Sequence, residues 1–134
     1  MGLTWCDRFA FRYDARFRAA LQAAGLGPDR SGVAVGDDMI VARFGPFVAE
    51  TSLTNVAHAA VTGPYRWWRA VGPRLSLADR GATFGTNAEQ GVCIRFREPV
   101  RALTPFHHPN LTVTVAEPDA LVTAIRRGRA SPQR

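Results

Sequence analysis

The pattern of apolar residues that indicates the fold is clearest in the sequence Val33-Ala34-Val35-Gly36-Asp37-Asp38-Met39-Ile40-Val41-Ala42-Arg43-Phe44. Its apolar residues recur at every second position, which predicts β-strands because alternate side chains of a strand point to opposite faces of a sheet. The residues Gly36-Asp37-Asp38 have turn chemistry. We therefore expect Val33 to Val35 and Met39 to Phe44 to form two strands joined by a tight turn.

The same period continues toward the centre of the chain. Gly45-Pro46 is a second turn, and Phe47 to Leu53 and Val56 to Thr62 are further strand candidates, joined by the polar pair Thr54-Asn55. Four short strands that follow one another so closely predict an antiparallel meander.

Upstream of this meander, the pattern predicts one more strand and one helix. Residues 8 to 13 alternate between aromatic and other side chains, which indicates a half-buried strand. Asp14 is a suitable N-cap for a helix that starts at Ala15, and Gly25 is placed to end it. The helix would present one apolar stripe, formed by Phe17, Ala20, Leu21 and Ala24.

Downstream, the chain returns to strands before it ends in a second helix. Arg74 to Ala78 and Ala82 to Thr86 are expected to pair across the turn Asp79-Arg80-Gly81. Val92 to Arg97 and Leu111 to Val115 alternate as strands do. A last amphipathic helix is expected to begin at Glu117-Pro118-Asp119, because an acidic residue and a proline favour a helix start.

These elements together predict an α+β fold that is mostly β. We expect an antiparallel β-barrel or roll of about seven strands, with a short N-terminal helix and a C-terminal capping helix. The chain is long enough for one domain, placed at residues 1–127, in which residues 1–30 form an N-terminal strand and helix extension. Residues 128–134 are expected to be a disordered, arginine-rich tail.

The order of the predicted elements resembles that of the bacterial pleckstrin-homology-like (PH-like) domain over roughly residues 31 to 127. The similar points are the aspartate-rich hairpin at Val35 to Val41, the step at Ser52 to Ala57, and the last strand, Leu111 to Val115, which leads into a helix. In the domain it resembles, that helix closes one end of a barrel. The segment before residue 31 departs from the usual form of the domain.

A second resemblance lies in the amino-acid sequence between residues 63 and 87. Several of its short motifs are similar to motifs of a family of small uncharacterised actinobacterial proteins. These motifs are Gly-Pro-Tyr-Arg-Trp-Trp-Arg, Gly-Pro-Arg-Leu-Ser, Asp-Arg-Gly and Thr-Phe-Gly-Thr-Asn. This resemblance covers most of the chain and implies no function.

Composition indicates an ordinary globular protein. Hydrophobic residues make up 46% of the chain and charged residues 21%, and no apolar run reaches the roughly 18 residues that a membrane helix needs. The first residues carry Trp5 and Asp7 where a signal peptide would need an uninterrupted apolar stretch. We therefore expect a cytoplasmic protein, in which Cys6 and Cys93 are free thiols.

The positive charge is concentrated at the C-terminus. The formal net charge is +6, and all 17 basic residues are arginine. Residues 1 to 125 hold 13 arginines against 11 acidic residues, whereas residues 126 to 134 hold four arginines and no acid. This distribution indicates at most a weak, non-specific attraction of the tail to polyanions, and it disfavours a specific nucleic-acid partner.

The candidate binding site lies in the segment from Gly63 to Asn87, which follows neither a helix nor a strand period at its start. We name as ligand- or partner-binding candidates the aromatic and basic residues Tyr65, Arg66, Trp67, Trp68, Arg69, Arg74 and Arg80. Such residues are enriched in binding hot spots and at anionic surfaces. The alternative is that the rings cap one end of the barrel while the arginines pair with Asp79 and Glu89.

The sequence offers no recognisable catalytic or metal centre. His107 and His108 lie between prolines, which favours a solvated turn, and His58 lies in a predicted strand. A metal at this pair would need a third and a fourth ligand from Cys93, His58, Asp79 or Glu98, which only the fold could bring together. Asp37 and Asp38 adjoin in a turn and are expected to point apart. We expect no catalytic residue, no metal and no cofactor.

The sequence therefore favours a non-catalytic binding or interaction module, whose partner is a protein or an anionic ligand and which could also contact a membrane surface peripherally. One alternative is a small-ligand-binding barrel or enzyme with a His-lined pocket, which requires an interior cavity of about 300 Å³ or more. Another is weak nucleic-acid binding through the arginines.

Overall fold

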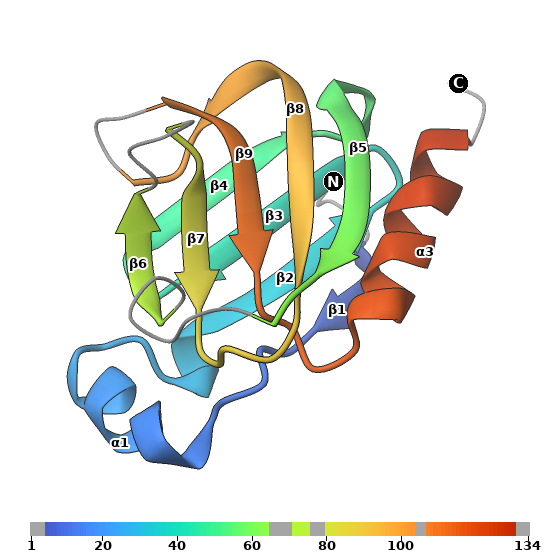
Figure 1. The fold of residues 1–134 in the computed structure, drawn as a ribbon. Coiled ribbons are helices and arrows are strands. Elements are labelled where there is room, and N and C mark those ends of the chain that lie inside the picture. The colour runs from blue at the N-terminus through green and yellow to red at the C-terminus, as the bar shows by residue number, and fades with distance from the viewer. Residues whose placement is uncertain (1–4, 65–70, 76–79, 104–106, 131–134) are drawn as a thin grey trace.

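The computed structural model describes residues 5–64, 71–75, 80–103 and 107–130, and this part of the chain forms two β-sheets and two α-helices (Figure 1). The first sheet has the strand order β1-β2-β3-β4 and consists of β1 (Trp5–Phe9), β2 (Ser31–Gly36), β3 (Met39–Phe44) and β4 (Phe47–Ser52). The second sheet has the order β5-β8-β9-β7-β6 and consists of β5 (Val56–Thr62), β6 (Gly72–Leu75), β7 (Ala82–Gly85), β8 (Gly91–Arg101) and β9 (His107–Val113).

The predicted class, α+β and mostly β, is confirmed, but the barrel is wrong. The two sheets stay separate, the described residues form nine strands instead of about seven, and β7 pairs with β9 in parallel. On one side the hydrogen-bond ladder stops because the 3₁₀ turn η2 (Leu53–Asn55) stands between β4 and β5. Beside β5, the helix α3 (Pro118–Ala130) lies between this strand and the first sheet, so no strand pairing joins the two sheets there (Figure 1).

The predicted meander is confirmed for its first three strands, which form β2, β3 and β4, but its fourth strand is wrong, because Val56–Thr62 is β5 of the second sheet and pairs with β8. Val35 faces Ile40 across the first turn, and Phe44 faces Phe47 across the second. Burial along β3 alternates as the sequence indicated, since Ile40, Ala42 and Phe44 are buried and Arg43 is exposed. The inner face of this sheet is therefore apolar, and its other face meets solvent.

The core lies between the two sheets, whose strands cross obliquely (Figure 1). Phe44 and Phe84 are fully buried at its centre, with ring centroids 5.5 Å apart, and the Phe11 ring stacks on Phe44 at 5.6 Å. Ile94 and Leu111 of the second sheet are also about 1% exposed. Side chains thus fill the space between the sheets.

The C-terminal helix α3 covers the opening beside β5, as Figure 1 shows. Leu121 and Ile125 are fully buried on the apolar stripe that the sequence predicted. A Cβ atom placed on Gly128 would lie 2.5 Å from the Leu53 Cδ1 atom, so glycine allows the helix to approach η2 closely. The helix continues to Ala130, past the predicted start of the tail at residue 128, and residues 131–134 lie outside the described part.

The N-terminal helix α1 (Ala15–Ala23) begins and ends where the sequence indicated. The side chain of Asp14 caps it, since one carboxylate oxygen accepts a hydrogen bond from the Arg16 backbone N–H at 2.9 Å. Hydrogen bonds from the Arg16 side chain and backbone hold the pKa of Asp14 below its usual value. Gly25 follows the helix with φ of +82°, a conformation that glycine adopts without strain.

The strand predicted at residues 8 to 13 is shorter and divided. After Phe9 the chain leaves the first sheet, and Phe11 forms an isolated bridge with Val115. Backbone hydrogen bonds then attach the segment to the second sheet, from Arg12 N to Thr114 O and from Asp14 N to Thr86 O, both at 3.0 Å. The chain therefore connects the two sheets here. β1 ends opposite Val33 and does not reach the start of β2 at Ser31.

The phenol of Tyr13 links this N-terminal segment to the loop after α1 by donating a hydrogen bond to the Leu26 carbonyl. Burial raises the pKa of Tyr13 above its usual value of 10.0, a polar contact with Ser31 opposes that rise, and the charge of Asp29 adds to it. Because the folded state holds the phenol proton more tightly than the unfolded state, this stabilisation is present below pH 10 and is lost as the pH rises through the folded pKa.

We therefore expect Tyr13→Phe to lower the free energy of unfolding by about 1 kcal/mol at neutral pH, through loss of the hydrogen bond. The difference between wild type and variant should shrink above pH 10, where the wild-type phenol ionises. Urea unfolding of both proteins across this range, followed by circular dichroism, measures it. A difference that grows with alkaline pH would contradict the argument.

Candidate functional site

The predicted aromatic-arginine site lies mostly outside the described residues. Tyr65, Arg66, Trp67, Trp68 and Arg69 fall in the segment 65–70, so their prediction stays a prediction. Arg74 lies on β6, is exposed, and donates from Nε to the Val71 carbonyl at 2.7 Å. Arg80 is exposed just before β7, with φ of +64°, a conformation that is uncommon for residues other than glycine.

Both ends of that segment are attached to the second sheet. Gly63 follows β5 with φ of +129°, and a Cβ atom there would lie 2.3 Å from the Glu89 carbonyl oxygen. Gly72, with φ of +90°, pairs with Gly85 at the other edge of the sheet. Only glycine fits such a close backbone approach, so the position of Gly63 against the Glu89 backbone is well defined.

The two adjacent histidines do not form a solvated turn, and that prediction is wrong. His107 and His108 begin β9, where His107 is exposed and His108 is fully buried. Pro109 does not interrupt the strand pairing, because the β8–β9 register shifts between Arg95 and Val100 and leaves the proline without a residue opposite it. A bulge thus accommodates the residue that favoured a turn.

His108 has a structural partner on each ring nitrogen. Nε2 accepts a hydrogen bond from the Leu103 backbone N–H at 3.2 Å, and Nδ1 lies 2.8 Å from the Arg80 carbonyl oxygen. A carbonyl can only accept, so Nδ1 carries the proton and donates. Both nitrogens bond to backbone groups, so His108 connects β9 to Leu103 and to Arg80, which lies two residues before β7.

The other predicted chemical candidates do not come together. His58 lies exposed on β5, opposite Arg95, and Cys93 is half-buried on β8 opposite Thr112. Asp79 lies outside the described residues. Among the residues that the structure describes, no group of three or more His, Cys, Asp and Glu side chains is placed to hold a metal ion.

The cavity between the two sheets of the described part is too small for a small-molecule ligand. A cavity of about 10 Å³ lies between the sheets, with Ile40, Ile94 and Leu111 among its lining residues. This volume is about that of one water molecule and far below the roughly 300 Å³ of a small-molecule site. The cavity does not match the His-lined pocket that the sequence left open as an alternative.

A buried polar cluster stands where the N-terminal segment meets the second sheet. The Thr86 hydroxyl and the Asn87 amide both donate to the Arg12 carbonyl, and the Thr86 backbone N–H donates to Thr114 Oγ1 at 2.7 Å. Asn87 Oδ1 accepts from the backbone N–H of Glu89 at 2.9 Å. No buried side-chain polar atom in the described part lacks a partner, so this cluster has a structural explanation and no free group for chemistry.

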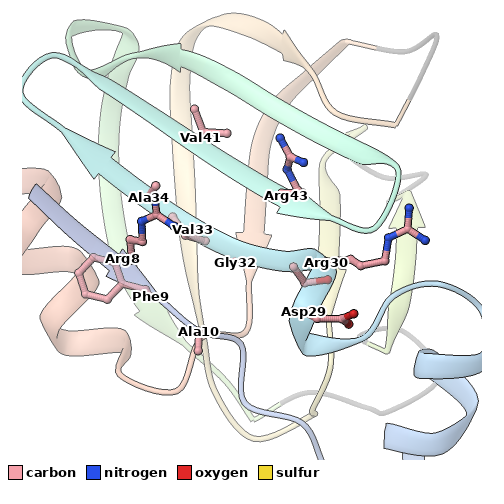
Figure 2. A pocket seen from close by; sticks show the side chains of 11 residues that line it. Arg8, Phe9, Ala10, Asp29, Arg30, Gly32, Val33, Ala34, Val41 and Arg43 are labelled. Carbon is pink, nitrogen blue, oxygen red and sulfur yellow. The ribbon is translucent and has the colours of Figure 1, made fainter. Parts of the chain in front are cut away.

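An open depression among the described residues lies on the outer face of the first sheet, where the sequence did not indicate a site (Figure 2). It measures about 580 Å³ and is lined by Arg8 of β1, Arg43 of β3 and Arg30, which lies in the 3₁₀ turn η1 (Pro28–Arg30). Its floor includes Gly32 and Ala34 of β2. We call this depression the arginine groove.

The groove exists because small residues lie between long ones. Ala34 faces Arg8 on one side of β2, and Gly32 faces Arg43 on the other. Two strand spacings and an offset of two residues put the Cα atoms of the two arginines about 12 Å apart. The absence of large side chains at Gly32 and Ala34 therefore leaves a hollow between two guanidinium groups (Figure 2).

The charge of the groove is positive. Arg8, Arg30 and Arg43 are exposed, and Asp29 is the single acidic residue in its lining. Two ion pairs of the described residues join Arg12 to Glu89 at 2.7 Å and Arg16 to Asp14 at 2.9 Å, and neither of them uses a groove arginine. On the same face, Glu50 of β4 stands opposite Val41 and lies outside the lining of the groove.

Sequence reasoning missed these arginines because they come from three separate elements. The usable signal was the alternation itself, since it assigned Arg8 and Arg43 to outward positions. Their proximity also requires the strand register, in which β1 and β3 both pair with β2. That register depends on tertiary structure, and a pattern within a single strand does not contain it.

Comparison with known proteins yields no relative for this chain: no family model, no curated protein and no solved structure matches it. Within the described residues, neither helix has the length and apolar character that crossing a lipid bilayer requires.

Proposed function

We propose that this protein is a non-catalytic binding module that holds an anionic partner in the arginine groove. The observation that carries the proposal is the presence of three exposed guanidinium groups, those of Arg8, Arg30 and Arg43, around one open depression with a single carboxylate in its lining. Guanidinium groups bind carboxylates and phosphates through paired hydrogen bonds, and they do so best where no protein carboxylate already occupies them.

The shape of the groove supports the same function. Its floor of glycine and alanine lets a ligand backbone approach the sheet closely, while the arginines rise on either side. A depression of about 580 Å³ that is open to solvent suits a partner that lies along the surface better than one that is enclosed. Clustered charge of one sign also attracts an oppositely charged partner from a distance.

The order of the elements supports the proposal of a PH-like relationship. A meander of strands, a second sheet, and a terminal helix that covers the opening between the sheets follow one another as the resemblance implies. The open sheets and the additional strands differ from that architecture. The aromatic-arginine segment is a second proposed surface, favoured by the exposure of Arg74 and Arg80 beside it.

The groove is tested by removing its charges without changing its size. We expect the double variant Arg8→Gln, Arg43→Gln to bind an anionic probe, such as heparin or an acidic peptide, about tenfold more weakly, because each exposed charge contact contributes up to about 1 kcal/mol. Isothermal titration calorimetry at low salt measures the change. Binding should weaken further as salt is raised.

The matched control is Arg95→Gln, which removes one charge from the outer face of the second sheet, where Arg95 is exposed. It should leave the affinity close to that of the wild type. A second variant, Ala34→Leu, keeps all charges and fills the floor, so it should also weaken binding. If Arg95→Gln weakened binding as much as Arg8→Gln or Arg43→Gln does alone, the overall charge and not the groove would hold the probe.

A further inference from the structure

The arginine groove coincides with a place where the edge of a strand is left open. β1 ends at Phe9, which faces Val33, whereas β2 begins two residues earlier at Ser31. On the β1 side, Ser31 and Gly32 therefore have no paired strand among the described residues. Ala10 lies on the other side of this gap, because the chain turns there toward the second sheet.

The open edge presents backbone hydrogen-bonding groups. In an antiparallel strand, successive residues direct their N–H and C=O groups alternately to the two sides. Both Ser31 and Gly32 pair with β3 on one side, opposite Phe44 and Arg43. One of the two residues must consequently direct its N–H and C=O toward the gap, where an added strand could pair with them.

The side chains around the gap select the chemistry of such a strand. Arg8 lies at one end, Arg30 directly precedes Ser31, and Arg43 stands opposite Gly32, as Figure 2 shows. Acidic side chains two or four residues apart on an extended strand are separated by about 7 or 14 Å, which brackets the spacing of about 12 Å between Arg8 and Arg43. Charge complementarity thus favours an acidic segment.

We propose that the partner in the arginine groove is an extended acidic peptide segment, which adds a short strand to the edge of β2 at Ser31 and Gly32 and places its carboxylates against Arg8, Arg30 and Arg43. The inference rests on the proposed function and specifies its partner. A single-stranded nucleic acid is favoured less, because bases stack on exposed aromatic rings and the one ring in the lining, that of Phe9, is half-buried.

The probe is a short synthetic peptide of alternating glutamate and valine with a fluorescent label. Because the amides of alternate residues point to opposite edges of a strand, N-methylation of all glutamate amides blocks one edge, and N-methylation of all valine amides blocks the other. Only the edge that faces β2 forms hydrogen bonds. We expect one methylated peptide to bind the wild-type protein at least about tenfold more weakly and the other to bind as the parent peptide does.

Further probes separate charge from strand pairing. A peptide of the same composition with its glutamates and valines in two blocks keeps the charge and loses the alternation, so it should bind more weakly than the parent. In NMR spectra of the labelled protein, the amides of Ser31 and Gly32 should shift with the parent peptide. The double variant Arg8→Gln, Arg43→Gln should weaken the parent peptide about tenfold.

The outcomes distinguish the two proposals. Equal binding by both methylated peptides, or equal weakening of both, would overturn strand addition, whereas arginine-dependent binding of heparin, a single-stranded oligonucleotide or anionic vesicles would keep the groove as an anion site. If the arginine variants bound every anionic probe as the wild type does, the proposed function itself would be wrong, and the peptide inference with it.

Discussion

We expect His108→Ala to lower the free energy of unfolding by about 3 kcal/mol, although the residue has no assigned chemical role. The side chain is fully buried, and its two nitrogens bond to the Arg80 carbonyl and the Leu103 N–H. Alanine leaves a cavity and two backbone groups without partners, and each of these changes is costly. Denaturant unfolding followed by tryptophan fluorescence measures the loss.

The neighbouring histidine is the matched control. His107→Ala removes the same side chain from an exposed position one residue away, so it should change the stability by about 0.5 kcal/mol or less. His108→Asn can place an amide N–H near the position of Nδ1 and should recover part of the stability. Equal effects of the two alanine variants would show that the buried ring does not connect β9 to Arg80.

The elements whose local signals agree were predictable from the sequence. The first sheet follows strict alternation, with Ile40, Ala42 and Phe44 buried and Arg43 exposed. The helix α1 has its capping aspartate and its terminating glycine at the expected places. In both cases the residues that determine the element lie within it, so a single strand or helix contains the whole signal.

The differences arise where distant parts of the chain meet. The pairing of β7 with β9 is parallel and joins Ala82 to Leu111, and no local pattern indicates such a neighbour. Pro109 argued for a turn, but a bulge in the adjacent strand removes the need for its N–H. The division of the strand predicted at residues 8 to 13 has the same origin, because Arg12 finds its partner in Thr114.

The candidate site shows the same limit from the functional side. A concentration of tryptophan and arginine in one segment is visible in the sequence, and it predicts a binding site within residues 63–87. A groove made by Arg8, Arg30 and Arg43 becomes visible only when β1 and β3 flank β2. A site whose residues come from several strands can be predicted only when the strand register is known. Sequence patterns therefore reveal mainly sites that lie within one continuous segment.

The largest effect on stability is expected for Phe84→Ala, at about 3 to 5 kcal/mol. Phe84 is fully buried between the sheets, and its ring lies 5.5 Å from that of Phe44 and 6.5 Å from that of Phe47. Alanine removes the second-sheet ring from a set of aromatic contacts whose other members, Phe44 and Phe47, belong to the first sheet. Because protein interiors are close-packed, the neighbouring side chains can fill the cavity that alanine leaves only if a strand moves.

Two variants of the same strand test whether packing causes this loss. Phe84→Leu retains most of the buried volume and should cost less than half as much, whereas Thr83→Ala changes the opposite face of β7 and should cost about 1 kcal/mol or less. The arginine groove lies on the outer face of the first sheet, so folded Phe84→Ala should still bind an anionic probe with wild-type affinity. A loss of unfolding free energy no larger than that of Thr83→Ala would contradict a core in which the two sheets pack around this ring.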